Sequence, residues 1–434
     1  MEVGKPGDGT APGYVFVAPK NGPEEATPAQ DGCLIFDDLG EPVWFRPLRL
    51  EDRDVMNFKL QSYRGRPVLT WWEGVHTGYG QGEFVIMDDS YREVTRVRAG
   101  GGYEADHHEF LITPQDTALI DIYHKVPVDR SEQGGAKEQN VLDGIVQEVD
   151  IETGEVLFEW HSLDHVRLEE SYPGTYDYFH INSVELDHDG NLLVSSRSTS
   201  TVYKVARPGG EVIWRLGGKR SDFAMGEGAR FAFQHDARSH PDGTITLFDN
   251  RGEDMNEPSR AVALKLDERA MTATLAREYV HPDRFFAIYQ GNVQALPGGN
   301  VFVGWGSSPV VSEFGGGGKL LYDADFPPEN ETYRAFHFPW KGKPEDGPAL
   351  AAESGPEDEV TLYASWNGAT EVASWQVLSG PDLGGLESVG SVPRKGFETV
   401  ITLRTPEPYV AVEARDHSGR VLGVSQAIKP GASA

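Results

Sequence analysis

A strand, a short polar turn and a second strand recur along the chain, and this repeat limits the possible folds more than any other feature of the sequence. One such unit has its turn near residues 38, 89, 153, 208 and 268, so successive copies lie 51 to 64 residues apart. A second unit of the same kind lies between them, at residues 110–120, 183–194, 237–247 and 293–303. Each repeat therefore holds four short strands, without helical periodicity. Four-stranded units of this length are typical of the blades of a β-propeller.

The two ends of the repeat region indicate how the ring closes. Five blades begin near residues 57, 108, 180, 235 and 291. The N-terminal strands at 14–18, 34–36 and 43–45 lack an innermost strand, which residues 332–340 can supply. Joining both ends in one blade leaves no open sheet edge. We therefore predict an all-β protein with a six-bladed β-propeller over residues 12–341.

A different pattern follows the propeller. Residues 342–349 are rich in Gly, Pro and charged residues and are predicted to be a linker. Beyond them, apolar and polar residues alternate in four segments, at 360–366, 370–377, 398–403 and 409–414. Such alternation is typical of half-buried antiparallel strands, so we predict a small immunoglobulin-like β-sandwich over residues 350–430. Its expected role is packing against the propeller, with sugar binding as the alternative.

The charge of the chain excludes two classes of partner. Lys and Arg number 39 against 68 Asp and Glu, which gives a formal net charge of −29. Nucleic acids and anionic membrane surfaces attract basic faces, so we expect neither as a partner. Residues 1–5 do not open a signal peptide, and the protein is expected either to be exported with its signal removed or to be cytoplasmic. The single Cys33 allows no intrachain disulfide and is expected in the core.

The face with the long connections is the expected functional face, because loops on a rigid scaffold usually hold binding and catalytic residues. These connections lie at 125–143, 162–179, 217–233 and 280–290. At the same face, His108, His180 and His235 begin the innermost strands of three successive blades, and Gln290 stands at this point in the next blade. Equivalent positions converge on the central axis, so we predict that these side chains share one site. Arg197 ends a second strand and is expected beside His180.

Further side chains at this face suit a flat substrate. Tyr123 and His124 end the second strand of another blade and are weaker candidates for the site. The loops hold many aromatic rings, which bind aromatic ligands, and we expect contacts from Tyr103, Tyr178 and Phe286. A basic segment is expected near the approach to the site, at Arg215, Lys219 and Arg220. The expected partner is a small aromatic molecule, and neither a metal nor a cofactor is expected. The sequence does not indicate an oligomeric state.

Several motifs resemble those of the arylsulfate sulfotransferase family, whose members need no nucleotide sulfate donor. The resembling segments are 179–185 (FHINSVE), 195–197 (SSR), 212–218 (VIWRLGG), 234–238 (QHDAR) and 248–250 (FDN). Together they form a fairly specific signature over the propeller region, closer to the second, less characterised branch of the family than to its periplasmic enzymes. The resemblance implies a six-bladed propeller, in agreement with the repeat.

The resemblance also implies roles for individual residues. It makes His235 the nucleophile that carries the sulfuryl group as a transient sulfohistidine. His180 and Arg197 would bind the sulfate oxygens, with Asn182 in support, and His108 would act on the phenolic oxygen or the sulfate. The implied reaction moves a sulfuryl group from an aryl sulfate to a phenol in two half-reactions. Positive groups at the equatorial oxygens would stabilise its loose transition state, as in phosphoryl transfer.

Three other functions are compatible with the same residues. A related scaffold can use the channel histidines for acid–base chemistry on a natural product, such as elimination, cyclisation or isomerisation. Three histidines with Asp236 or Glu109 nearby can hold zinc or iron, although the neighbouring Arg197 argues against a cation. A propeller that binds a ligand without catalysis is the third alternative.

Overall fold

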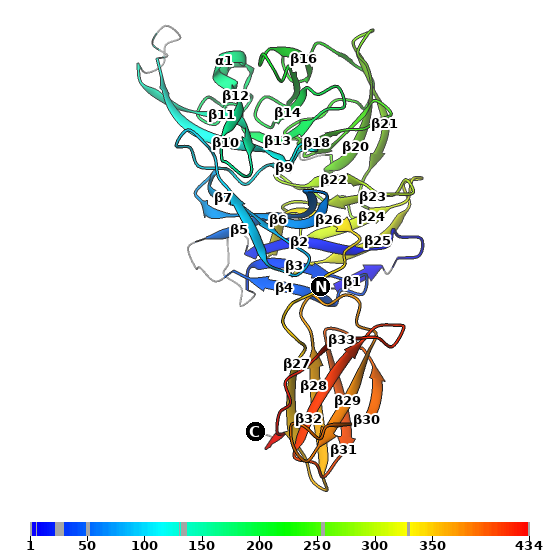
Figure 1. Cartoon of the computed structure of the whole chain (residues 1–434). Helices are drawn as coiled ribbons and strands as arrows, with labels where there is room; N and C mark the ends of the chain where they lie inside the picture. Colours follow the sequence, from blue (N-terminus) through cyan, green and yellow to red (C-terminus); the bar gives the residue numbers. More distant parts are fainter. Residues whose placement is uncertain are drawn as a thin grey trace.

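The computed structural model describes residues 2–5, 7–21, 30–48, 53–129, 131, 137–252, 257–327 and 330–432. Its regular structure is almost entirely β-sheet, which confirms the all-β prediction (Figure 1). The helical exceptions within these ranges are α1 (Ser162–His165) and one turn of 3-10 helix (Leu168–Glu170). No helix in the same ranges has the length and apolar character needed to cross a bilayer.

Six sheets built on four antiparallel strands each occupy the described residues up to Phe338, and this form fits propeller blades. Four consecutive strands form each of three sheets. The first contains β5 (Asp54–Tyr63), β6 (Arg66–His76), β7 (Gly80–Met87) and β8 (Glu93–Val97), and the second contains β9 (Phe110–Ile112), β10 (Thr117–Val128), β11 (Gln139–Asp150) and β12 (Val156–His161). The third contains β13 (Ile181–Leu186), β14 (Leu192–Ser196), β15 (Thr201–Val205) and β16 (Val212–Gly217).

Two further sheets gain a fifth strand at one edge, and the sixth joins distant parts of the chain. One of them consists of β18 (His235–Ser239), β19 (Thr244–Asp249), β20 (Arg260–Asp267) and β21 (Thr272–Tyr279), with β17 (Ala224–Met225) added beside β21. The other consists of β22 (Asn292–Ala295), β23 (Val301–Gly304), β24 (Val310–Phe314) and β25 (Leu320–Asp325), with β1 (Glu2–Lys5) added beside β25. In the sixth sheet, β26 (Asn330–Phe338) pairs antiparallel with β2 (Tyr14–Asn21), followed by β3 (Gly32–Phe36) and β4 (Pro42–Pro47).

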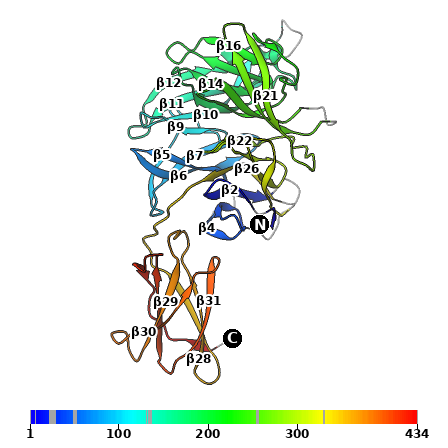
Figure 2. The same cartoon turned by 90° about the vertical axis from the view of Figure 1, so that its right-hand side faces the viewer.

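The six sheets contact one another in cyclic order. Strand β5 contacts β9, β9 and β10 contact β13, and β13 contacts β18. Strand β22 then contacts β18 on one side and β26 on the other. Both β26 and β2 contact β5, so the sheet made from the two ends of this region lies between the last and the first of the others. In both views these sheets form one body and the C-terminal strands a second (Figures 1 and 2).

Two features of this region differ from the expectation. The connection expected over 125–143 is in large part a continuation of the β10–β11 hairpin, whose pairing extends to Val128 opposite Gln139. Strand β1 adds to the edge of β25, although its four residues carry no strand pattern of their own. In both cases pairing with a neighbouring strand, rather than local hydrophobic alternation, determines the conformation.

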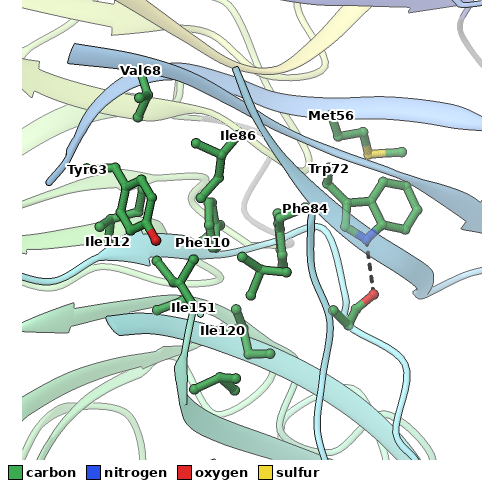
Figure 3. Close-up of a cluster of buried hydrophobic side chains, with 14 of the residues drawn as sticks. Met56, Tyr63, Val68, Trp72, Phe84, Ile86, Phe110, Ile112, Ile120 and Ile151 are labelled. Atoms are coloured by element: carbon green, nitrogen blue, oxygen red, sulfur yellow. Dashed lines mark hydrogen bonds between the residues drawn. The ribbon is translucent and has the colours of Figure 1, made fainter. Parts of the chain in front are cut away.

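A hydrophobic cluster between two neighbouring sheets positions the segment that leads into the cavity described below (Figure 3). Phe84 of β7 and Phe110 of β9 stack in it, with ring centroids 4.4 Å apart. Trp72 of β6 is fully buried, and its indole Nε1 donates a 3.0 Å hydrogen bond to the carbonyl of Ala105. This bond fixes the backbone directly before residues 106–108.

The C-terminal strands form two four-stranded sheets around one hydrophobic cluster that includes Leu362, Trp375 and Val412. In spatial order, the first sheet contains β31 (Glu398–Arg404), β28 (Glu359–Ser365), β27 (Ala349–Ser354) and β34 (Gly431–Ala432). The second contains β30 (Glu387–Pro393), β29 (Ser374–Gly380), β32 (Tyr409–Arg415) and β33 (Val421–Val424). Alternating burial along β28 and β29 reflects their alternating sequences.

Hydrogen bonds connect this C-terminal unit to the rest of the chain. The hydroxyl of Tyr91 donates to the carbonyl of Gly368 at 2.8 Å and accepts from the indole of Trp340 at 2.9 Å. The side chain of Asn367 bonds both the backbone N–H and the carbonyl of Phe45, each at 2.9 Å. These contacts lie away from the histidines, which are held by the inner strands of the larger body.

Candidate active site

The four residues predicted to be catalytic line one cavity together with Gln290. The cavity has a volume of about 480 Å³, which suits a small organic ligand. The ring centroids of His108 and His180 are 5.2 Å apart, and those of His180 and His235 are 6.5 Å apart. The structure therefore brings together the histidines that the repeat places at equivalent positions, with Arg197 in the same wall.

Left-handed backbone conformations stand at the start of three inner strands. The φ angles of His180, Asp236 and Gln290 are 50°, 56° and 65°. Irregular pairing follows in β13, between Ile181 and Ser183, and the pairing of β18 is likewise shifted directly after its first residue. A left-handed non-glycine residue costs roughly 1–2 kcal/mol, and bulges re-aim the side chains around them. The strain is thus concentrated where the strands enter the cavity.

His235 is held in one tautomer. Its Nδ1 lies 2.8 Å from Oδ1 of Asn250. The Asn250 amide donates to the carbonyls of Ala287 and Gln290, at 2.8 and 3.0 Å, so its oxygen faces the ring and Nδ1 carries the proton. The lone pair on Nε2 accepts a long, 3.3 Å hydrogen bond from the backbone N–H of Gln290. Burial, assisted by the charge of Arg197, lowers the pKa of His235 well below its usual value, and the ring is neutral at pH 7.

Each of the other two histidines contacts a carboxylate through Nδ1. His180 is bound to Asp177, and His108 is bound to Asp106. A carboxylate at Nδ1 fixes the proton there and orients the ring, which leaves Nε2 as the second nitrogen for chemistry. Burial, followed by the neighbouring His107, lowers the pKa of His108 to about 3.

Arg197 brings a guanidinium into the cavity wall. Its Cζ lies 4.7 Å from the ring centroid of Phe233, and one N–H donates to the carbonyl of Ile288 at 3.3 Å. Its Nε is buried and makes no hydrogen bond within the described part of the chain. The carboxylate that acts on it, Asp177, is already bound to His180. A guanidinium with N–H groups left over is suited to bind an oxyanion.

A buried ionic network joins the inner strands of four sheets beside the histidines. Glu109 lies 2.8 Å from Lys59 and 3.3 Å from Arg334, and it also contacts Arg238. Asp236 lies 2.6 Å from Arg238. Each of the two carboxylates directly follows a cavity histidine in the sequence. Burial lowers the pKa of Lys59 to about 8, so the ammonium group is still mostly charged at pH 7.

Two residues expected to bind substrate support the histidines from behind the cavity lining. The ring of Tyr123 lies 5.6 Å from that of His108, and its hydroxyl donates to the carbonyl of Ile181 at 2.6 Å. Asn182 is fully buried, and its amide donates to the carbonyl of Gln234 at 2.6 Å. Both side chains thus bond the backbone of neighbouring strands rather than project into the cavity.

Four further expected contacts lie elsewhere. The side chain of Tyr178 is fully buried, and its hydroxyl donates to Ser162 at 2.9 Å. His124 is exposed and packs against Tyr103, with ring centroids 5.0 Å apart. Phe286 is half-buried. None of the four is among the lining residues of this cavity. Their positions in the sequence placed them near the functional face, but the sequence does not give the direction in which each side chain points.

The expected basic segment contacts a neighbouring loop. Arg215 and Arg220 share Glu170, at 3.7 and 3.2 Å. Lys219 donates to the carbonyl of Glu169 at 3.1 Å and lies 4.7 Å from the ring centroid of Tyr172. These cations therefore hold the 167–172 segment in place.

The cavity also contains residues that the repeat did not predict: Lys20, Asp54, His76, His107 and Glu331. Lys20 and Glu331 form an ion pair of 2.9 Å. His107 directly precedes His108, so the pair of histidines in the sequence was an available signal. The others come from strand ends and turns, whose meeting point depends on the tertiary structure.

The comparison with protein families identifies the family of the chain. The family model described as arylsulfotransferase (ASST) matches residues 59–327, more than half of the chain. The chain belongs to this family. The match spans His108, His180, Arg197 and His235 and confirms the resemblance inferred from the motifs.

Curated proteins provide no match to this member of the arylsulfotransferase family, whereas solved structures do. One is a protein of unknown function from Bacteroides caccae, with 15% identity and a TM-score of 0.46, covering 75% of this chain and 99% of that chain. A streptogramin B lyase has 9% identity and a TM-score of 0.41, covering 83% and 93%. A catalytically inactive virginiamycin B lyase from Staphylococcus aureus with quinupristin has 9% identity and a TM-score of 0.39, covering 82% and 93%.

Proposed function

We propose that this protein transfers a sulfuryl group from an aryl sulfate to a phenol through a sulfohistidine at His235. The observation that carries the proposal is a difference between histidine partners. His108 and His180 each contact a carboxylate, whereas His235 is held by a neutral amide. The amide oxygen holds the Nδ1–H tautomer of His235, so the ring is neutral with its lone pair on Nε2, whereas the rings bound to carboxylates are suited to exchange protons. Family membership supports the same class of reaction.

In the first half-reaction, Nε2 of His235 attacks sulfur while the bond from sulfur to the aryl oxygen breaks, and the phenolate leaves. The hydrogen bond from Gln290 to Nε2 must be given up, and at 3.3 Å it is weak. Arg197 binds the sulfuryl oxygens, assisted by His180 through Nε2–H when that ring is protonated. Asn250 continues to accept from Nδ1–H of the sulfated ring.

In the second half-reaction, a phenol takes the place of the departed group. Its oxygen attacks sulfur, the nitrogen–sulfur bond to His235 breaks, and the phenolic proton passes to Nε2 of His108, which returns it to the phenolate released in the next cycle. The 5.2 Å separation of the His108 and His180 rings supports these roles, because a proton acceptor is needed close to the group that binds the sulfuryl oxygens.

For the scaffold, we infer that the six sheets close into a six-bladed propeller over residues 12–341. The cyclic contacts and the pairing of β26 with β2 support this closure. We further infer that residues 342–349 form a linker and residues 350–430 a β-sandwich, because two sheets there share one core.

A panel of aryl sulfates that includes p-nitrophenyl sulfate, with and without a phenol acceptor, tests the reaction. We expect nitrophenol release by the wild type and by His281→Gln, a control that removes a buried histidine bound to Asp323 outside the cavity. We expect no release by His235→Ala. Without acceptor, intact mass spectrometry should detect one added SO₃ group in the wild type and in His281→Gln, but not in His235→Ala. Absence of turnover across the panel contradicts the reaction, and an adduct that persists in His235→Ala contradicts the nucleophile.

One observation favours acid–base chemistry as a second candidate. His108 and His180 lie edge to face, each with its own carboxylate, and two such neighbouring groups can act as acid and base on one substrate. In that case His108→Ala and His180→Ala would lose activity while His235→Ala retained it. The sulfotransferase proposal requires the reverse for His235.

A further inference from the structure

One part of the cavity wall gathers a carboxylate and two imidazoles in three consecutive residues. Asp106, His107 and His108 are 0%, 3% and 5% exposed, and their donor atoms lie within 4.8 Å of one another. Nδ1 of His107 is 3.4 Å from Oδ1 of Asp106, and Nδ1 of His108 contacts the same oxygen. Two ring nitrogens therefore converge on one carboxylate.

Two buried polar atoms in this cluster make no hydrogen bond to any described residue. One is Nδ1 of His107, and the other is Oδ2 of Asp121, which lies 4.0 Å from Nδ1 of His108. The other oxygen of Asp121 accepts from the backbone N–H of Glu109 at 2.8 Å, which fixes the carboxylate in place. A buried polar atom without a hydrogen bond costs about 1–3 kcal/mol, so two of them beside the same pair of histidines indicate a ligand that both can bind.

We propose that Asp106, His107, His108 and Asp121 together bind one divalent transition-metal ion. Two imidazoles and two carboxylates are a donor set that zinc, iron(II) and similar ions accept. Donors around a tetrahedral ion with bonds of about 2.1 Å lie roughly 3.4 Å apart. The His107–Asp106 pair already has this spacing, whereas the His108–Asp106 contact must open and Asp121 must move closer. In the loaded site the ring proton of His108 resides on Nε2, and this histidine donates to a substrate oxygen rather than accepting from one.

The cationic groups of the cavity are engaged elsewhere. Arg197 stacks on Phe233, and its charge acts on His235 rather than on this cluster. Lys20 acts electrostatically on His107, but Glu331 neutralises it in a 2.9 Å ion pair. Arg197 therefore does not argue against a cation at this ligand set. The set differs from the one expected from the sequence, which comprised the three channel histidines with Asp236 or Glu109. The proposal does not rest on sulfuryl transfer, but a loaded site would prevent Nε2 of His108 from accepting the phenolic proton in the second half-reaction.

Metal analysis of the full chain tests the site. The protein is purified without chelator, incubated with excess Zn²⁺ or Co²⁺ and desalted, and the bound metal is counted by mass spectrometry. We expect about one ion per chain in the wild type and in His281→Gln, and at least tenfold weaker Co²⁺ binding in His107→Gln and Asp121→Asn. A wild type that retains neither metal overturns the proposal, as does unchanged binding in both variants.

X-ray absorption of the Co²⁺-loaded wild type provides a second measurement that does not depend on folding of the variants. Two imidazole ligands in the first shell support the site, and a shell of oxygen alone overturns it. The nitrophenol assay, run on chelator-treated and on metal-loaded protein, separates the two proposals. Bound metal without turnover supports the metal site and contradicts sulfuryl transfer, whereas turnover by a chain that binds no metal supports sulfuryl transfer and overturns the metal site.

Discussion

Replacing Asn250 with Ala should reduce turnover by removing the group that fixes the tautomer of His235. The side chain bonds Nδ1 of His235 at 2.8 Å and the carbonyls of Ala287 and Gln290 at 2.8 and 3.0 Å. Leaving the buried Nδ1–H without an acceptor costs about 1–3 kcal/mol, so the tautomer with its lone pair on Nε2 loses most of its advantage. We expect kcat/KM to fall about 10- to 100-fold, since roughly 1.4 kcal/mol corresponds to a factor of ten.

Steady-state kinetics and nitrogen-15 NMR of labelled histidine measure the two halves of this prediction. The wild-type spectrum should show the proton of His235 on Nδ1, and Asn250→Ala should show a mixture of tautomers. Asn300→Ala is a matched control, because this amide also donates to two oxygens, those of Gly9 and Glu313 at 3.0 and 2.7 Å, outside the cavity. A wild-type proton on Nε2 would refute the reasoning, and so would unchanged kcat/KM in Asn250→Ala.

Three further predictions concern binding, pH and the domain junction. Arg197→Lys should raise KM about tenfold with a smaller change in kcat, because an ammonium lacks the planar fork that binds an oxyanion, and unchanged KM would contradict this role. Burial raises the pKa of Glu185 from 4.5 to about 7, so the folded state binds a proton more tightly than the unfolded state does. The free energy of unfolding should therefore fall by up to about 3 kcal/mol as the pH rises from 4.5 through 7. Urea unfolding of Glu185→Gln should lack this loss. Tyr91→Phe should lower the free energy of unfolding by about 1–3 kcal/mol, because it leaves Trp340 Nε1 without its acceptor. Tyr322→Phe should change this free energy little, because the Tyr322 hydroxyl makes no hydrogen bond in the described structure.

Much of the strand organisation could be predicted because each repeat carries its own turn residues and apolar alternation. The pairing of residues 332–340 with the N-terminal strands was also accessible, since three strands without an inner neighbour require one. The length of the β10–β11 hairpin was not, because residues 125–128 and 139–142 are partly polar and adopt strand conformation by pairing with each other. Strand β1 depends in the same way on the edge of β25.

The candidate site was predictable only where it follows the repeat. His108, His180 and His235 were found because strand starts in neighbouring sheets converge, and this required no knowledge of side-chain contacts. Asp177 and Asn250, which orient two of these rings, come from a loop and from the residue after a strand end, and no periodic pattern marks them. Their partnership with the histidines arises from the left-handed turns and close packing at the strand entries.

The acidity of the whole chain and the field in the cavity arise from different residues. The net charge of −29 discourages polyanions at the outer surface. Beside the histidines, however, the three cations Lys59, Arg238 and Arg334 contact the two buried carboxylates Glu109 and Asp236. Lys59 contributes most of its charge at pH 7, because its pKa falls only to about 8. Salt screens buried charges much less than surface charges, so the field in the cavity depends on this network more than on the acidic outer surface.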